Sequence, residues 1–298
     1  MKLRLSMLSI FAALILSSPA LWAQDLGPGF TKVKDGIYVF ASKEGNSTCS
    51  IVLTQEGAVV IDSCQTPLDT QKFSAGIKKL TDKPIRFLID TEVHNDHTFG
   101  HYVFSPPAVV INHEGAGEGM KKNFDPKRIE TLNAQSPEMS EAVKNYKFIP
   151  PQIEYKDKMT INLGERTFEL LYLKNVHSEA DTAIWLPKER VLFAASAANV
   201  KSIINLRPFV TIPDILATYK LMKSLNPEVV VPGHGPVSTT KIFEGFYTLL
   251  LKRVTEMANQ GKSLDEIKKE LKMPEYADWA GQDRLGVNID VAYKSVKK

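Results

Sequence analysis

The sequence predicts an α/β fold in which two sheets pack together and helices cover their outer faces. Apolar runs of strand length gather in two blocks, within residues 36–113 and 159–195, and helix-like stretches follow each block. Two sheets bury their apolar faces against each other, and the helices then cover the outer faces. A doubly wound parallel sheet is the alternative. It needs helices between nearly all strands, and residues 159–195 show no helical pattern.

The first block begins with three strand-like runs, and "QEG" between the second and third is typical of a tight hairpin turn. The expected strands of this block are 36–41, 49–54, 58–63, 85–90 and 108–113, with a helix at 68–80. The polar residues 114–148 are expected to be helical. The second block holds four strands between 159 and 195. It is followed by a helix at 213–225, a buried strand at 228–233 and helices near 238–260, 263–272 and 288–297.

Residues 1–23 are typical of a signal peptide rather than of folded structure. Lys2 and Arg4 precede the apolar run "MLSIFAALIL", and "SSPALWA" ends on the small residue Ala23. Ser17, Ser18 and Pro19 interrupt the apolar run too early for a stable membrane anchor. We therefore expect a periplasmic or secreted protein whose single mature domain spans residues 24–298, including the C-terminal helices.

The charge balance of the mature chain favours a small-molecule substrate over nucleic acid. Without Lys2 and Arg4 the chain has 35 basic and 34 acidic side chains, which gives no cationic surface for a polyanion. The sequence makes no prediction of the oligomeric state.

The two cysteines, Cys49 and Cys64, flank the expected hairpin. With Glu56–Gly57 as the turn pair, Cys49 falls opposite Cys64, and an oxidising compartment would permit a disulfide. Two reduced cysteines on neighbouring strands are equally compatible with this pattern, because cross-strand pairs often miss the spacing that a disulfide needs.

The stretch "TEVHNDHTFGH", residues 91–101, holds three of the six histidines in the chain. It follows an apolar strand, and alternation of side chains would point Glu92, His94 and Asp96 to one side, with His97 brought round by a turn. His177 and His234 also lie in loops that follow apolar strands. Converging strand ends would gather these six donors into a site that suits zinc, and also iron or manganese. We expect structural roles for His101 and His113.

Four segments, "EVHNDH", "NVHSEADTAIWLP", "RVLFAASA" and "VVPGHGP", resemble the metallo-β-lactamase superfamily in their motifs and in their order, from about residue 36 to residue 236. The resemblance implies an αββα sandwich of two mixed sheets with a two-zinc site at one edge. It implies that Glu92, His94 and His177 hold the first metal, and that Asp96, His97 and His234 hold the second.

The sequence departs from the familiar motifs of that family at two positions. Glu92 stands where the family usually has histidine in H-x-H-x-D-H. A carboxylate can still bind zinc, but the site becomes more anionic. Ser196 stands where many family hydrolases have an aspartate that bridges two metals, and this resembles the third metallo-β-lactamase subclass. Asp181 in "HSEAD" is expected either to orient a ligand histidine or its loop, or to be a plain turn residue.

These residues predict a zinc-dependent hydrolase in which metal-bound hydroxide attacks a cyclic amide or ester carbonyl, with Asp96 as the catalytic carboxylate. β-Lactams are the leading substrates, and lactones, other esters and thioesters are the alternatives. Arg207, in the loop 200–212, is a candidate for binding a substrate carboxylate, and the alternative is a solvated loop arginine. A metal-binding protein without turnover and a di-iron redox protein remain as alternatives.

Overall fold

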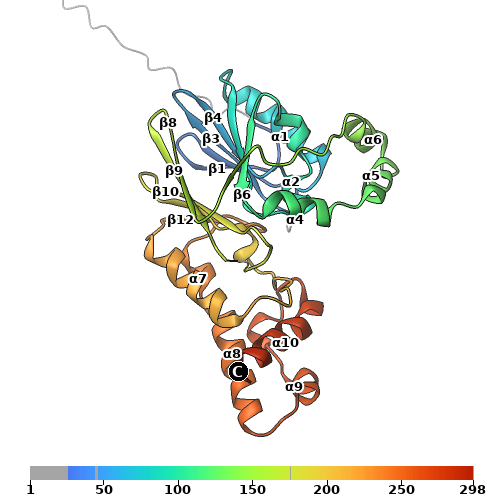
Figure 1. The fold of residues 1–298 in the computed structure, drawn as a ribbon, viewed down its shortest axis with the longest axis vertical. Coiled ribbons are helices and arrows are strands. Elements are labelled where there is room, and N and C mark those ends of the chain that lie inside the picture. The colour runs from blue at the N-terminus through green and yellow to red at the C-terminus, as the bar shows by residue number, and fades with distance from the viewer. Residues whose placement is uncertain (1–25, 44–45, 175, 298) are drawn as a thin grey trace, which may run out of the picture.

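The structure, a computed structural model, describes residues 26–43, 46–174 and 176–297. The predicted signal peptide lies outside these described residues. Two mixed sheets pack face to face, and helices cover their outer faces (Figure 1). This arrangement confirms the αββα sandwich expected from the sequence.

The first sheet contains seven strands in chain order. Its first four strands pair antiparallel, and the last three join in parallel, each after a helical crossover. Parallel pairing brings the carboxyl ends of the fourth, fifth and sixth strands to one edge of the sheet. The strands are β1 (Phe30–Lys34), β2 (Ile37–Phe40), β3 (Cys49–Thr54), β4 (Gly57–Ile61), β5 (Ile85–Ile89), β6 (Val109–His113) and β7 (Ile153–Tyr155).

The second sheet contains five strands in the order β12-β11-β10-β9-β8. β12 joins β11 in parallel, and the other pairs are antiparallel. The strands are β8 (Lys158–Leu163), β9 (Arg166–Tyr172), β10 (Thr182–Leu186), β11 (Val191–Phe193) and β12 (Val229–Val231).

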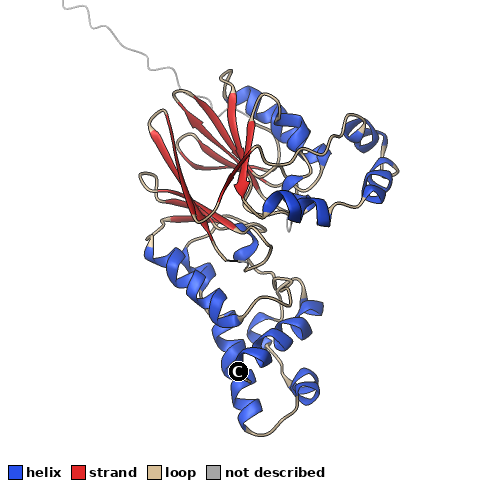
Figure 2. Ribbon diagram, in the orientation of Figure 1, coloured by secondary structure: helices blue, strands red, loops and turns tan. Residues whose placement is uncertain are grey.

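Helices connect and cover the sheets (Figure 2). Proline in the first turn and a capping side chain start several of them. In the first helix Thr66 accepts a hydrogen bond from the Asp69 backbone N–H, directly before Pro67. The helices are α1 (Pro67–Leu80), α2 (Asn95–Thr98), α3 (His101–Phe104), α4 (Ala116–Asn123), α5 (Pro126–Asn133), α6 (Pro137–Val143), α7 (Ile212–Ser224), α8 (Phe246–Asn259), α9 (Leu264–Glu270) and α10 (Leu285–Val296).

The apolar faces of the two sheets form the central core. Ile61 and Ile89 of the first sheet and Phe168 and Leu170 of the second belong to one buried cluster. Fully burying one such side chain stabilises the fold by roughly 1.5–3 kcal/mol. The strand ends that carry the polar loops are therefore attached to a rigid core.

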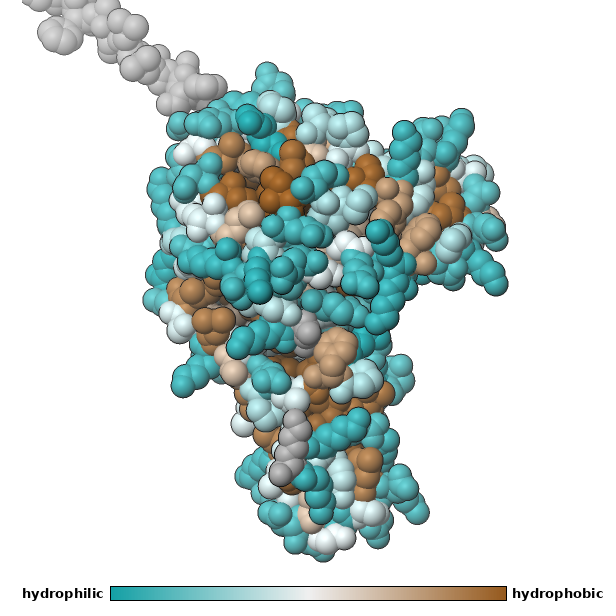
Figure 3. All heavy atoms as spheres, in the orientation of Figure 1, coloured by the Kyte–Doolittle hydropathy of each residue, from teal (hydrophilic) through white to brown (hydrophobic). Residues whose placement is uncertain are grey.

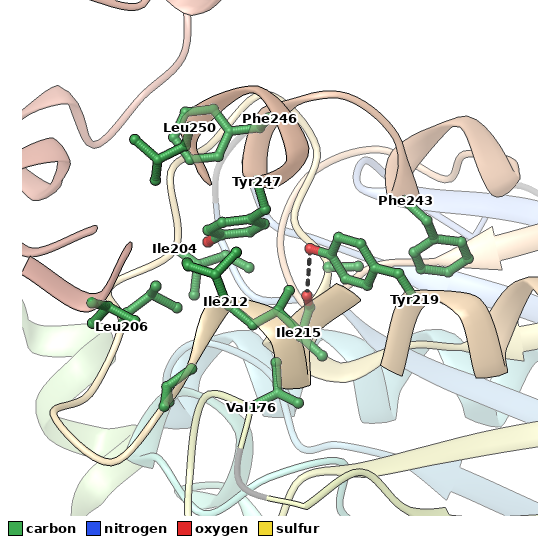
Figure 4. Packing of buried hydrophobic residues seen from close by; sticks show 14 of the residues in the cluster. Val176, Ile204, Leu206, Ile212, Ile215, Tyr219, Phe243, Phe246, Tyr247 and Leu250 are labelled. Atoms are coloured by element: carbon green, nitrogen blue, oxygen red, sulfur yellow. Dashed lines mark hydrogen bonds between the residues drawn. The ribbon is translucent and has the colours of Figure 1, made fainter. Parts of the chain in front are cut away.

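Separate clusters fix the helices to the outer faces. On the first sheet, Phe73 of α1 and Phe104 of α3 pack over buried residues of β3 to β6. On the second sheet, α7, α8 and α10 share a larger cluster, and the Tyr219 hydroxyl donates to the Ala197 carbonyl over 2.9 Å (Figure 4). Helices α8 to α10 extend beyond the sheets (Figure 1).

Three expectations about the first sheet were incomplete or wrong. β1 and the three-residue β7 were not predicted. The hairpin turn is Gln55–Glu56 rather than Glu56–Gly57, because Thr54 pairs with Gly57. Cys49 is therefore not directly opposite Cys64. The two residues are nevertheless joined by a disulfide, with their Cα atoms 4.9 Å apart, because Cys64 follows the end of β4 in a left-handed conformation (φ 69°).

The face of the molecule drawn in Figure 3 is mostly hydrophilic, with separate apolar areas among the polar side chains. Within the residues that the structure describes, no helix combines the length and apolar character needed to cross a bilayer.

Candidate metal centre

Three loops at one edge of the sandwich bring the six predicted donors together. The first loop follows β5, and His94 stands at the N-terminus of the short helix α2, which carries Asp96 and His97. His177 lies between β9 and β10, and His234 follows β12. The donors form two groups, Glu92–His94–His177 and Asp96–His97–His234, and within each group the ligand atoms lie within 4.8 Å of one another.

The first group centres on the fully buried carboxylate of Glu92. Its Oε2 atom contacts His94 Nδ1 and lies 3.6 Å from His177 Nε2. Arg207 donates to His94 Nε2 over 2.9 Å, so this nitrogen accepts and Nδ1 carries the proton that faces Glu92. A metal ion bound here would replace that proton.

The second group centres on Asp96, whose Oδ2 atom lies 3.3 Å from His234 Nε2 and 3.8 Å from His97 Nε2. The Asp96 side chain is 26% exposed, whereas that of His97 is completely buried. The group therefore has a buried imidazole at its base and a carboxylate open to solvent.

His97 connects the two groups. Its Nε2 atom lies 3.1 Å from Glu92 Oε1, and its Nδ1 atom lies 3.0 Å from Asp62 Oδ2. Asp62, at the end of β4, also accepts hydrogen bonds from the backbone N–H and the hydroxyl of Thr91, over 2.7 Å each. Asp62 thus orients both the His97 ring and the chain that leads to Glu92.

The electrostatics of the centre favour ionised carboxylates. Burial disfavours the charge on Glu92, but the charge of His97 and the hydrogen bond with His94 hold the pKa of Glu92 well below its usual value. Burial likewise opposes the charge on Asp96, and His97 and His234 lower the pKa of that carboxyl. Burial disfavours the charged form of His97, yet Glu92, Asp62 and Asp96 raise its pKa well above the ordinary value.

This donor set fits divalent metal ions. The buried carboxylate of Glu92 and the partly exposed carboxylate of Asp96 face four imidazoles. Oε1 of Glu92 makes no hydrogen bond within the described residues, although His97 Nε2 lies 3.1 Å away. Burial lowers the pKa of His177 to about 4, so this imidazole is neutral near pH 7 and available as a ligand. Carboxylate oxygen and neutral imidazole are the ligands that zinc, iron and manganese accept.

Asp181 shapes the His177 loop rather than the His177 ring. It accepts from the backbone N–H groups of His177 and Ser178 and from the Ser178 hydroxyl, the last over 2.6 Å. Burial, with a contribution from the Glu92 charge, raises the pKa of Asp181 to about 7. Of the two predicted roles for Asp181, orientation of a ligand loop is the one that this geometry supports.

A polar cavity of about 990 Å³ opens above both donor groups. Lys201 in its wall pairs with Asp278 over 3.3 Å, so three arginines and Asp96 are the remaining charged side chains of the lining. The lining includes His94, Asp96, His177 and His234, the arginines Arg128, Arg207 and Arg284, and the asparagines Asn46, Asn95, Asn123, Asn199 and Asn205. The cavity therefore presents positive charge and amide groups to a bound molecule.

The family model described as the metallo-beta-lactamase superfamily matches residues 42–234, which include all six donors. The chain belongs to this superfamily. Members of this superfamily bind divalent metals, and both donor groups lie within the matched residues.

The curated relatives of this chain include enzymes whose names indicate different substrates. The chain is 20% identical over 219 residues to the 2,4-dinitroanisole O-demethylase subunit alpha of Nocardioides sp. (strain JS1661), covering 73% of this chain and 58% of that one. It spans about half the length of the curated relatives it matches.

Two solved structures show the same superfamily fold at low sequence identity. The sec-alkylsulfatase Pisa1 from Pseudomonas sp. superposes with a TM-score of 0.69 at 16% identity, over 89% of this chain and 50% of that one. A metallo-beta-lactamase from Pontibacter korlensis superposes with a TM-score of 0.56 at 20% identity, over 74% and 96%.

His101, His113 and Ser196 are not among the six donors, and each contacts other side chains. His101 is buried and pairs with Asp90 over 2.8 Å, and His113 stacks on Tyr172 with ring centroids 3.7 Å apart. Ser196 Oγ lies 3.4 Å from His97 Nε2. Both histidines lie outside the two donor groups, as expected.

Sequence reasoning missed two kinds of site residue. Asp62 could have been found from "VVIDS", since it ends a buried strand in the same way as Asp90. Arg284 and Asp278 reach the cavity from the C-terminal region, and no local pattern marks them.

Proposed function

We propose that the protein is a secreted hydrolase that uses two divalent metal ions, with zinc as the leading candidate, to cleave a small molecule bearing an anionic group. The observation that carries the proposal is the position of two donor groups below a cavity lined by three arginines, none of which forms an ion pair with a carboxylate among the described residues. Arginine binds carboxylate and sulfate oxygens through charge-assisted hydrogen bonds.

The residues of the centre support this chemistry in distinct ways. Metal ions bound there would lower the pKa of water towards neutrality and polarise the bond to be cleaved. Asp96 faces the cavity beside His234, and its ionised, partly exposed carboxylate can accept a hydrogen bond from a water molecule at the centre and orient it. Arg207, adjacent to His94, is placed to bind the anionic group of a substrate close to the reacting bond.

β-Lactams are the first substrates in this proposal. They carry a carboxylate that the cavity arginines could bind, and Ser196 resembles the residue of the third metallo-β-lactamase subclass. Sulfate esters are the second candidate. The cationic cavity and the fold shared with the sec-alkylsulfatase Pisa1 over 89% of this chain favour them.

A substrate panel tests the proposal. Zinc-loaded protein is assayed with a chromogenic cephalosporin, an alkyl sulfate, a neutral lactone and a thioester, and Asp96→Ala serves as the matched inactive control. We expect turnover of the cephalosporin or the alkyl sulfate that exceeds turnover of the neutral lactone. Metal-replete protein that cleaves none of the four, or that cleaves the neutral lactone faster than both anionic substrates, contradicts the proposal.

The proposed location is the periplasm. The leader-like residues 1–23 and the Cys49–Cys64 disulfide both favour an oxidising compartment outside the cytosol. Expression of the full chain in a Gram-negative host, followed by cell fractionation and mass measurement, tests this point. Unprocessed protein in the cytosol contradicts it.

A further inference from the structure

The Cys49–Cys64 disulfide joins two backbone segments that hold the second donor group. We call Ser47–Cys49 the first support segment and Ser63–Gln65 the second support segment. Both segments are buried apart from Gln65, and each contains one of the two cysteines. None of their residues is one of the six metal donors.

The first support segment holds the loop that carries His234. The Thr48 backbone N–H donates to the Gly233 carbonyl over 2.8 Å, and the Thr48 hydroxyl donates to the Pro232 carbonyl over 2.6 Å. Ser47 forms an isolated antiparallel bridge with His234. Its hydroxyl also donates to the Asp96 carbonyl. This segment therefore fixes the backbone of two of the three donors.

The second support segment holds the third donor. The Ser63 backbone N–H and the Ser63 hydroxyl both donate to the His97 carbonyl, over 2.7 Å each. The Ser63 hydroxyl in turn accepts from the Gly100 backbone N–H over 2.9 Å. The turn that carries His97 is thus attached to the residue that precedes Cys64.

Apart from the disulfide, a hydrogen bond from the Ser47 N–H to the Gln65 side chain, 2.9 Å, directly links the two segments. Glu92 and His94 share the β5 loop with Asp96 and His97, but the donors of the first group have additional supports. The Thr182 N–H donates to the Thr91 carbonyl over 2.8 Å, and Asp181 accepts from the His177 N–H. Neither contact involves a support segment.

We propose that the Cys49–Cys64 disulfide is a positioning element for the second metal, so that its reduction weakens metal binding by Asp96, His97 and His234. Metal affinity depends on ligands held close to their bound geometry, and the disulfide restricts the two segments that hold these three ligands. Binding by Glu92, His94 and His177 is expected to change little. This inference rests on the proposed two-metal centre.

A phosphine can be used to reduce the Cys49–Cys64 disulfide. The S–S bond breaks, two thiols form, and the phosphine is oxidised to its oxide with oxygen from water. Because free thiols can themselves bind zinc, the main comparison uses Cys49→Ala/Cys64→Ala, which removes the disulfide without leaving a thiol.

The experiment is a zinc titration of metal-free protein against a chromogenic chelator, with cobalt absorption spectra as a second readout. Wild type should bind two ions. The double alanine variant should keep one site at its original affinity and show at least a tenfold weaker second site. Val254→Ala, a buried change in α8 outside both segments, is the matched control. It should lower the thermal midpoint and leave both affinities unchanged.

Two further samples keep the test decisive if the double variant does not fold. Thr48→Val retains the disulfide but removes the hydroxyl bond to Pro232, and should weaken the second site alone. Phosphine-treated wild type should do the same, and it should recover on reoxidation. Unchanged affinities at both sites in these samples, or an equal loss at both sites, would overturn the inference. If untreated wild type binds no metal, the proposed function itself fails.

Discussion

Oε1 of Glu92 lies 3.1 Å from Nε2 of His97, although these two residues belong to different donor groups. One buried carboxylate therefore contacts members of both groups. This contact makes Glu92, which stands where the superfamily usually has histidine, the most informative residue of the centre.

Glu92→Ala should weaken metal binding by the first group at least about tenfold, which corresponds to about 1.4 kcal/mol of binding free energy. The variant loses a charged donor, and His97 loses a carboxylate partner. Glu92→His should retain zinc binding, because imidazole is also a zinc ligand. Zinc titration of the three proteins measures the effect. An alanine variant with wild-type affinity at both sites would rule out Glu92 as a ligand.

Asp96→Ala and His234→Ala should each lower hydrolysis at least about a hundredfold, a loss of roughly 2.7 kcal/mol of transition-state stabilisation. Both side chains extend from loops at the cavity, so the sheets should remain folded. Circular dichroism checks the fold, and steady-state kinetics measures the loss. Folded variants with full activity would remove the second donor group from the mechanism.

Arg207→Ala should raise KM for an anionic substrate while changing KM for a neutral analogue little. The guanidinium lies at the cavity beside His94 and can bind an anion there. Arg253→Gln is the matched control, since Arg253 pairs with Glu275 away from the cavity. Equal effects of Arg207→Ala on the charged and neutral substrates would indicate a structural role.

Leu170→Ala should destabilise the protein by roughly 2–5 kcal/mol, because it leaves a cavity between the two sheets. Leu170 is fully buried in the cluster that both sheets share. Chemical denaturation of metal-free protein measures the change in unfolding free energy. A change below about 1 kcal/mol would mean that the sheets can close the gap.

His113 should make the folded protein less stable as the pH falls. Burial lowers its pKa, despite the opposing charge of Glu114. Between that lowered value and the ordinary pKa of about 6.5, the unfolded chain binds more protons than the folded chain, so stability falls as pH falls. His113→Phe, which keeps a ring against Tyr172, should lose less stability than wild type between pH 7.5 and about pH 5.5. Thermal midpoints across this range make the comparison, and parallel curves would contradict it.

The sequence was sufficient for the sheets and for the donor residues because both produce local signals. Apolar runs marked β3, β5 and β6 closely, and strand-end loops marked His177 and His234. β1 is short and partly exposed, so its apolar pattern is weak. The hairpin register was misjudged by one residue, since "QEG" permits two turn positions and strand patterns alone do not separate them.

The wall of the cavity could not be predicted for a different reason. Arg284 lies 77 residues beyond Arg207 in the chain, and its place depends on how α10 packs against α7, α8 and α9. Side-chain periodicity predicts burial within a helix but contains no information about which distant loop the helix will meet.

The C-terminal region supplies part of the cavity without supplying any donor of either group. Ser202 forms a bridge with Ala280, and Arg284 donates to the Ile203 carbonyl over 3.0 Å, which fixes the loop that carries Arg207. Both partners lie outside the stretch 42–234 that defines the superfamily match. All six donors lie within the matched stretch, whereas part of the cavity wall lies outside it. Substitutions at residues 280–284 can therefore alter the wall without replacing a metal donor.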